Sequence, residues 1–352
     1  TMPDGLGDVA WSPDGRWIAF TSRTRHERYE AKDSSWQSPR KVERFFSRLN
    51  GEDWVFDRPN HVYVVVADGT GAPRNLTPGD FQHRGISWLP DSSAIVTASA
   101  RHDDRDRFRA TDLVVVPLDD TAEVRLLTGT DGIYTNPSVS PDGTRVALLG
   151  HSDPRTIPQN SKVGVVQVDA AAVPADEIIW ASADLDRTFH NTVGQPAPVW
   201  EDDDTLLASA EDRGDTQLFR VRADGSAPPD PVTSGPLTVT TFDAAGGTIA
   251  TARTTIDHPA ELYVGDERRT HVGDALADDL LGWEHFAART TDGTGEIDVW
   301  IMRPAGFDET ERYPVLLNVH GGPHTQYGEY FHDEFQMQAA AGFVVVAGNP
   351  RG

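Results

Sequence analysis

The residues most able to do chemistry in this sequence are His320-Gly321-Gly322-Pro323, which follow an apolar run at residues 315–319. Two successive glycines let the backbone turn sharply and leave its N–H groups free, and the proline then fixes the chain direction. Amides exposed at the end of a strand could stabilise negative charge on an oxygen atom during a reaction. A glycine-rich turn without chemistry explains these four residues equally well, so the neighbouring elements have to decide.

The stretches around this turn are predicted to form a small sheet with one helix. Residues 315–319 and 343–347 are short apolar runs rich in β-branched side chains, as in buried parallel strands. Between them, residues 335–341 indicate a short helix that Gly342 ends, and residues 283–288 and 297–303 indicate a preceding antiparallel pair. This order is typical of the first half of an α/β-hydrolase sheet, in which such a turn supplies one oxyanion donor.

The segment from 292 to 352 resembles the start of the peptidase domain of the prolyl oligopeptidase family, and especially its acylaminoacyl-peptidase-like branch. The matching residues are Asp292-Gly293, Trp300, Arg303-Pro304, Gly306-Phe307, Tyr313-Pro314, residues 320–324, Glu334-Phe335-Gln336, Ala341-Gly342 and residues 349–352. The family's dipeptidyl branch has a tyrosine in place of His320 and an adjacent pair of glutamates that this sequence lacks. The resemblance therefore favours the acylaminoacyl branch.

The resemblance implies roles for particular residues. The Gly322 amide would donate to the oxyanion, His320 would orient the turn, and Arg351 would contact substrate at the rim, beside Asn349. No Gly-x-Ser-x-Gly motif occurs in the sequence, so the catalytic serine, aspartate and histidine are expected beyond Gly352. We expect these residues alone to be inactive. Without the C-terminal remainder of the hydrolase domain, the strands at 315–319 and 343–347 would expose apolar surface.

Upstream of this segment, one pattern occurs five times. Three clear copies, at residues 9–20, 86–97 and 137–148, indicate a strand, a turn of the Pro-Asp-Gly type and a second strand. Degenerate copies lie at 198–208 and 241–250. A third apolar strand follows each copy, at residues 62–67, 113–118, 163–168, 217–221 and 260–264. Four copies close with a polar edge segment, at residues 74–77, 125–128, 231–233 and 268–270.

Four short strands per repeat indicate a β-propeller. We predict five blades between residues 9 and 272, and the family resemblance implies seven, with two of them upstream of Thr1. The predicted domains are an incomplete β-propeller at residues 1–280 and a truncated start of the α/β-hydrolase domain at residues 281–352.

A basic and aromatic insertion, from about residue 23 to 60, separates the first two repeats. Its basic residues could bind the carboxylates of a substrate. We favour the alternative that the insertion packs against a neighbouring blade or subunit. In that case its arginines are predicted to pair with Glu27, Glu43, Glu52 and Asp53.

Composition excludes several classes of partner. The formal charge of -24 argues against nucleic acid and anionic lipid, and no apolar run approaches the ~18 residues of a membrane helix. There is no cysteine, hence no disulfide and no cysteine-ligated metal. The acidic stretches at 102–107 and 201–204 and the scattered histidines lack metal-site spacing. We expect no cofactor and no metal, and a cytoplasmic location. Homo-oligomerisation is left open, and Thr1 begins in mid-pattern, so the natural N-terminus is expected upstream.

Two classes of function are compatible with these observations. One is a serine peptidase that cleaves short or N-acylated peptides through an acyl-enzyme, with the propeller restricting access; a dipeptidyl peptidase or oligopeptidase is the alternative specificity. The other is a non-enzymatic propeller that binds a protein partner. Residues 283–352 favour the peptidase, because a binding propeller has no use for a hydrolase half-sheet. Specificity depends on pocket residues mostly beyond Gly352.

Overall fold

The computed structural model describes residues 2, 4–25, 33–36, 39–45, 47–49, 53–156, 158–190, 194–322 and 325–350. In this part of the chain nearly all regular structure is β-strand, with one α-helix, α1 (Asp333–Ala340). None of the described helices has the length and apolarity needed to cross a membrane.

Contacts divide the chain into two compact units. The first unit comprises Thr1–Asp184, Asp202–Leu206 and Arg222–Pro228, and the second comprises Leu185–Glu201, Leu207–Val221 and Pro229–Gly352. The predicted domain boundary between residues 280 and 281 stays a prediction.

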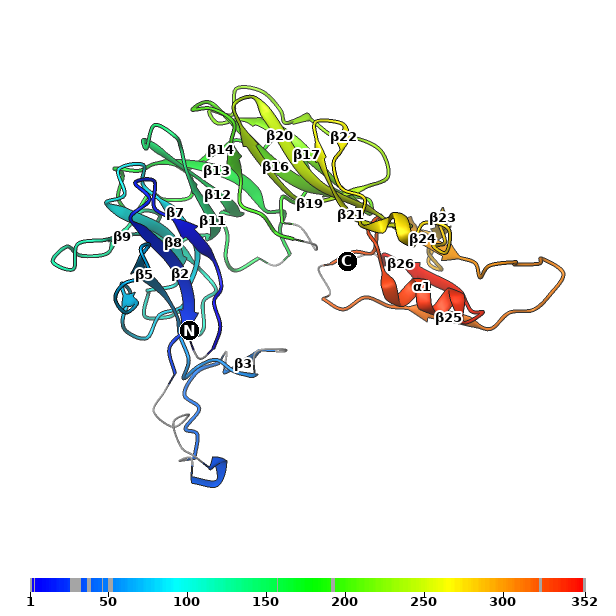
Figure 1. Cartoon of the computed structure of the whole chain (residues 1–352), viewed down its shortest axis with the longest axis horizontal. Coiled ribbons are helices and arrows are strands. Elements are labelled where there is room, and N and C mark those ends of the chain that lie inside the picture. Colours follow the sequence, from blue (N-terminus) through cyan, green and yellow to red (C-terminus); the bar gives the residue numbers. More distant parts are fainter. Residues whose placement is uncertain are drawn as a thin grey trace. The chain divides into compact units, whose positions relative to one another are not determined.

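The strands of residues 9–268 form repeated four-stranded antiparallel units of the propeller-blade type (Figure 1). Blade one comprises β1 (Val9–Trp11), β2 (Trp17–Arg23), β5 (Asn60–Val66) and β6 (Arg74–Asn75). Blade two comprises β7 (His83–Trp88), β8 (Ala94–Ser99), β9 (Asp112–Pro117) and β10 (Arg125–Leu126). Blade three comprises β11 (Ile133–Val139), β12 (Arg145–His151), β13 (Lys162–Gln167) and β14 (Ile179–Trp180).

Two further blades follow the same order within one eight-stranded sheet, in which β17 and β19 form a parallel bridge at Thr216 and Thr238. Blade four comprises β15 (Val199–Trp200), β16 (Thr205–Asp212), β17 (Asp215–Arg222) and β18 (Asp230–Pro231). Blade five comprises β19 (Thr238–Ala245), β20 (Thr248–Thr255), β21 (His258–Val264) and β22 (Glu267–Arg268). Each predicted third strand is present, so the prediction of repeated four-stranded sheets is confirmed. A closed ring of seven blades stays a prediction.

The Pro-Asp-Gly turns are held by their own side chains. In blade one the Ser12 hydroxyl donates to Asp14 Oδ1 at 2.6 Å, and Gly15 has a φ of 70°. The same arrangement recurs in blade three, where Gly143 has a φ of 73°. Glycine enters this left-handed region without steric cost, which lets the two strands return tightly.

Each blade is closed by the same kind of hydrogen bond. A threonine or serine that follows the fourth strand accepts a backbone N–H from the third strand. The pairs are Thr77 with Val62 at 2.9 Å, Thr128 with Leu113 at 3.0 Å, Ser182 with Val163 at 2.9 Å, Thr233 with Leu218 at 2.9 Å, and Thr270 with Leu262 at 2.9 Å. These hydroxyls satisfy backbone groups that would otherwise lack a partner. Four of them end the polar edge segments of the sequence, and Ser182 closes the blade whose edge segment was not predicted.

The insertion lies between β2 and β5 of blade one and includes β3 (Arg48–Leu49), β4 (Asp53–Trp54) and a 3₁₀ turn at Ser34–Trp36. Arg40 lies 3.9 Å from Asp57 and stacks over the ring of Trp54 at 5.0 Å, and Arg44 pairs with Asp80. The partners of Arg40 belong to the insertion itself, whereas Asp80 lies between blades one and two. The Arg44–Asp80 pair therefore favours the packing interpretation.

Of the predicted acidic partners within the insertion, only Glu43 can be checked. Glu43 pairs with Lys41 rather than with an arginine. Among the ion pairs of the described residues, Arg25, Arg40 and Arg44 pair with Asp4, Asp57 and Asp80, which were outside the predicted set. Glu27 and Glu52, together with the side chain of Asp53, lie outside the described residues.

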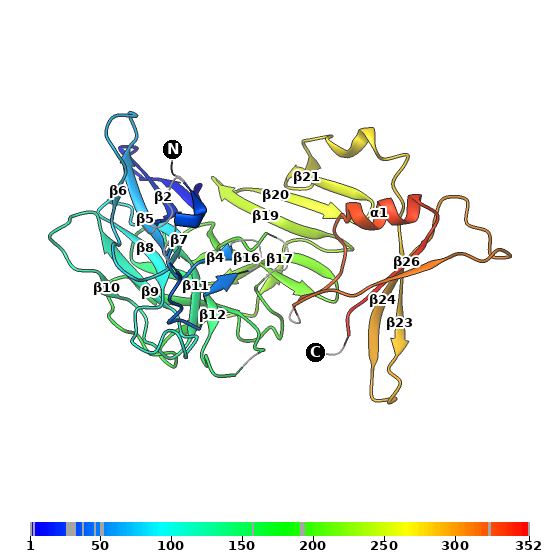
Figure 2. The ribbon, with the colours of Figure 1, turned by 90° about the horizontal axis from the view of Figure 1, so that it is seen from below.

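The C-terminal segment forms a mixed sheet in the order β23 (Glu284–Arg289), β24 (Glu296–Met302), β26 (Val344–Gly348) and β25 (Val315–Asn318). Strands β25 and β26 are parallel, and α1 connects them and lies beside them in both views (Figures 1 and 2). The antiparallel pair, the helix and the parallel pair follow the sequence prediction. Burial does not follow it fully, because Val315, Leu317 and Val319 are 61%, 69% and 73% exposed.

Candidate active-site loop

The loop after β25 carries the predicted oxyanion donor. Gly322 has a φ of 125°, a backbone conformation that side-chain-bearing residues rarely adopt. Gly321 and Gly322 are exposed, and within the described part of the chain no group accepts a hydrogen bond from either N–H. Amides in this state are able to donate to an incoming oxygen atom.

His320 contacts the loop on two sides. Its Nδ1 lies 2.9 Å from the carbonyl oxygen of Gly321. A carbonyl only accepts, so Nδ1 donates in this contact. Nε2 is buried and has no partner among the described residues, while the ring meets Tyr327 edge-on with centroids 5.3 Å apart. These contacts fix the direction in which the chain leaves β25.

Asn349 hydrogen-bonds to the loop backbone at Tyr327, a contact that sequence reasoning missed. Its Oδ1 accepts the N–H of Tyr327 at 2.8 Å, and its Nδ2 donates to the Tyr327 carbonyl at 2.9 Å. The Tyr327 ring also packs on His332 and Phe335, and burial raises the pKa of Tyr327. Arg351, predicted to contact substrate, lies outside the described residues, so its role stays a prediction.

The loop is also fixed to blade four, within the second unit. The carbonyl of Gly214, in the turn between β16 and β17, accepts the N–H of Glu329 at 2.8 Å. The side chain of Glu329 accepts a hydrogen bond from Trp283 Nε1 at 2.9 Å. Burial, followed by the nearby charge of Glu329, raises the pKa of Asp215 to about 7. Two carboxyl groups with raised pKa values thus lie where the loop meets the blade, and no sequence motif marked them.

His258, Glu261 and Asp274 place ligand-type atoms within 4.8 Å of one another. Arg268 donates to Glu261 at 3.0 Å and also to Asp274. Burial of Glu261 would raise its pKa, but the Gly273 N–H, the neighbouring hydroxyl and Arg268 outweigh burial and lower that pKa to about 2. The arginine already supplies the positive charge, so this group is an internal ion pair and carries no metal site.

Comparison with known proteins adds to this geometry. No protein-family model matches the chain. The chain is 31% identical over 166 residues to the uncharacterized peptidase YuxL of Bacillus subtilis, a match that covers 44% of this chain and 25% of that protein. It is 27% identical over 247 residues to a probable dipeptidyl-peptidase 5 of Emericella nidulans, covering 64% of this chain and 32% of that one.

The resemblance predicted from the sequence is confirmed: the chain matches the propeller region of prolyl oligopeptidase-family peptidases. Among solved structures, it is similar in fold to an acylaminoacyl peptidase of Pyrococcus horikoshii, with a TM-score of 0.74 and 22% identity over 98% of this chain. The chain spans 51% of that protein and a quarter to a third of the two curated relatives.

Proposed function

We propose that this chain is the propeller and the first strands of the α/β-hydrolase domain of a serine peptidase that cleaves short or N-acylated peptides. The catalytic serine, aspartate and histidine are proposed to lie in the remainder of the hydrolase domain. The propeller would restrict access to the site. The matched share of the solved acylaminoacyl peptidase, 51% of its length, supports a larger protein.

One observation carries the proposal: a parallel strand pair joined by a helix, with free glycine amides where the first strand ends. Strand β25 leads into Gly321 and Gly322, whose N–H groups have no partner among the described residues. A peptidase must stabilise the negative charge that forms on the carbonyl oxygen of its tetrahedral intermediate. Each aimed donor is typically worth about 3 kcal/mol. Gly322 is the proposed donor of this chain, and His320 is proposed to position it.

Substrate specificity has two candidate answers within this proposal. The likeness to acylaminoacyl peptidase and the histidine at position 320 favour N-acylated peptides. The likeness to proteins named dipeptidyl-peptidase 5 favours removal of dipeptides from a free amino terminus. Both reactions use the same acyl transfer, in which the serine replaces the amine at the substrate carbonyl and water then releases the acid.

Assays on the natural full-length protein test both the peptidase activity and its specificity. Matched chromogenic substrates, one an N-acetylated amino acid and the other a dipeptide with a free amino terminus, separate the two specificities. A fluorophosphonate probe should label the full-length protein at a serine outside residues 1–352. Label on this chain would contradict the assignment of the nucleophile. Absence of hydrolysis and of labelling in the folded full-length protein would instead favour a non-enzymatic propeller.

A further inference from the structure

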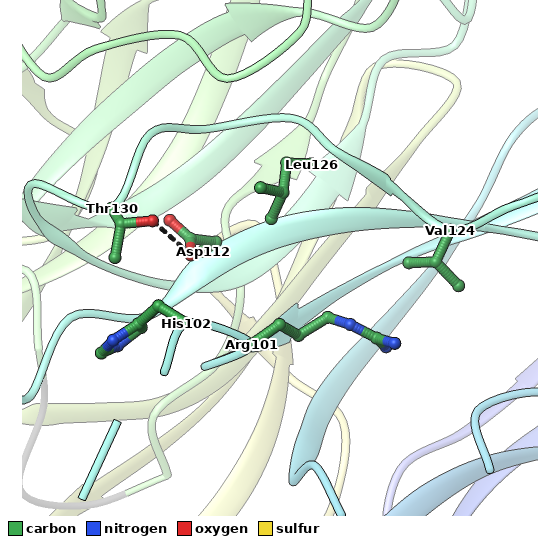
Figure 3. A pocket seen from close by; sticks show the side chains of 6 residues that line it. All are labelled: Arg101, His102, Asp112, Val124, Leu126 and Thr130. Atoms are coloured by element: carbon green, nitrogen blue, oxygen red, sulfur yellow. Dashed lines mark hydrogen bonds between the residues drawn. The ribbon is translucent and has the colours of Figure 1, made fainter. Parts of the chain in front are cut away.

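Blade two contains a cavity of about 190 Å³ that belongs to the first unit. Its lining residues are Arg101, His102, Asp112, Val124, Leu126 and Thr130. Figure 3 shows Asp112, Thr130 and His102 grouped at one end, while the guanidinium of Arg101 extends away from them toward Val124. The cavity therefore has an acidic end, a basic end and aliphatic side chains along its wall.

The carboxylate at the acidic end is buried and incompletely bonded. Asp112 is 1% exposed. Its Oδ1 has no hydrogen-bond partner in the described part of the chain, and its Oδ2 accepts a single bond, from Thr130 at 3.3 Å. Burial raises the pKa of Asp112 to about 6. A buried carboxylate without a compensating donor destabilises the folded chain.

Blade five shows what satisfies a carboxylate at this position of the repeat. Asp112 and Glu261 each precede the residue whose N–H bonds to the closing threonine. Glu261 receives Arg268 at 3.0 Å and the Gly273 N–H at 2.7 Å. Among the described residues no arginine or lysine donates to Asp112, and the basic group near it is His102. An arginine therefore fills this position of the repeat in blade five but not in blade two.

The guanidinium of Arg101, at the basic end, also has a nitrogen without a hydrogen-bond partner among the described residues. Arg101 stacks over the ring of Phe81 at 4.4 Å, which fixes its plane. Its Nη1 is buried and has no hydrogen-bond partner among the described residues. A guanidinium held by an aromatic face with an unused N–H is suited to bind a carboxylate.

We propose that this cavity binds a small zwitterion, a free α-amino acid with an aliphatic side chain. The ammonium group would bind Asp112, the carboxylate would bind Arg101, and the side chain would lie against Val124 and Leu126. This inference does not depend on the peptidase proposal, because every residue that carries it lies in blade two.

The charges that face Asp112 set the expected pH dependence. They are His102 on the segment after β8 and Asp131 after β10, beside the hydroxyls of Thr128 and Thr130. An ammonium ligand binds the ionised carboxylate, so affinity should fall as the pH is lowered through about 6. The same reasoning gives Asp112→Asn a higher melting temperature at pH 8 than the wild type, because the substitution removes a buried charge.

The test uses calorimetric titration of the full-length protein with L-leucine. We expect Asp112→Asn and Arg101→Gln each to weaken binding by 10-fold or more. Asp103→Asn is the matched control, because it makes the same charge change at an exposed residue outside the lining, and it should bind as the wild type does. Leucinamide lacks the carboxylate, so Arg101→Gln should not weaken its binding. 4-Methylpentanoate lacks the ammonium group, so Asp112→Asn should not weaken its binding.

A cavity-filling variant keeps the test decisive if a charge variant fails to fold. Leu126→Trp leaves both charges in place and should abolish leucine binding, with the melting temperature of the unliganded protein as the check on folding. If Asp112→Asn, Arg101→Gln and Leu126→Trp all bound leucine with the affinity of the wild type, the leucine would lie elsewhere. That result would overturn the proposal. A wild-type protein that binds no leucine at millimolar concentration would also overturn it.

Discussion

The backbones of Gly214 and Gly328 meet so closely that neither residue has room for a side chain. A Cβ atom at Gly328 would overlap the carbonyl group of Gly214, and one at Gly214 would lie 2.6 Å from the ring of Trp300. Both glycines belong to the second unit. Their contact fixes the turn between β16 and β17 against the loop that carries the proposed oxyanion donor.

Gly328→Ala should therefore destabilise the second unit, because the added methyl group forces the two backbones apart. We expect a loss of about 1–3 kcal/mol, the usual cost of overpacking. Urea unfolding followed by tryptophan fluorescence measures it. Gly282→Ala is the control, since a Cβ atom there meets nothing within 4 Å. Equal stability of the two variants would show that the contact can relax.

In the full-length protein, Gly322→Pro should lower kcat by ~100-fold or more, because it removes the proposed oxyanion donor. Gly322→Ala keeps the N–H but strains a residue whose φ is 125°, so it separates the amide from the backbone shape. Gly321→Ala should be near normal, because that position has open space and no left-handed φ. If folded Gly322→Pro had the same kcat as Gly321→Ala, Gly322 would not belong to the site.

Asp215 should make the second unit less stable as pH rises. Its carboxyl group has an ordinary pKa of 3.8, and burial with the nearby Glu329 raises that pKa to about 7 in the folded protein. Between these values the folded state binds more protons than the unfolded state, so the free energy of unfolding falls from pH 4 to pH 7. Asp215→Asn should flatten this slope in calorimetric melting, while Asp279→Asn, at an exposed site, should keep it. An unchanged slope in Asp215→Asn would contradict the prediction.

Thr77→Val should destabilise blade one, because it leaves the Val62 N–H without its acceptor at a site only 1% exposed. The cost of an unpaired buried donor is about 1–3 kcal/mol. Thr77→Ser retains the hydroxyl and should lose much less stability. Denaturant unfolding of the two variants compares them directly, and equal values would mean that the hydroxyl contributes nothing to closure.

The isolated 352-residue chain should associate through β25, because an apolar strand edge is exposed there. Leu317→Lys should reduce this association in analytical ultracentrifugation, since Leu317 is 69% exposed on that strand. The same substitution should abolish hydrolysis in the full-length protein, where the remainder of the domain would cover the edge. Val272→Lys, at a residue that is 75% exposed and lies outside the sheet, should change neither measurement.

Local chemistry explains why the blades could be predicted. The Ser-Pro-Asp-Gly turn and the alternating strands use contacts between residues a few positions apart, so Ser12, Asp14 and Gly15 carry their structure in the sequence. The ends of four blades were also visible, because their closing threonines follow short polar segments, whereas the segment that Ser182 ends was not predicted. The mixed sheet of the C-terminal segment was found for the same reason.

Contacts between distant residues were not predictable in this way. Nothing near Gly214 in the sequence indicates Gly328, and nothing near Asp112 shows that its Oδ1 would lack a partner among the described residues. Arg40 and Arg44 of the insertion pair with Asp57 and Asp80, which are 17 and 36 positions away in the sequence. Such pairings depend on how strands and loops meet in space, and a single sequence does not contain that information.

The closing bond of blade one has a consequence for how such a repeat can change. A long insertion separates β2 from β5, yet Thr77 still bonds to Val62 as its counterparts do in the uninterrupted blades. The connection between the second and third strands can therefore accept foreign sequence while the blade still forms. For protein engineering, the same connection in the other blades is a place where a binding peptide or a reporter domain could be grafted.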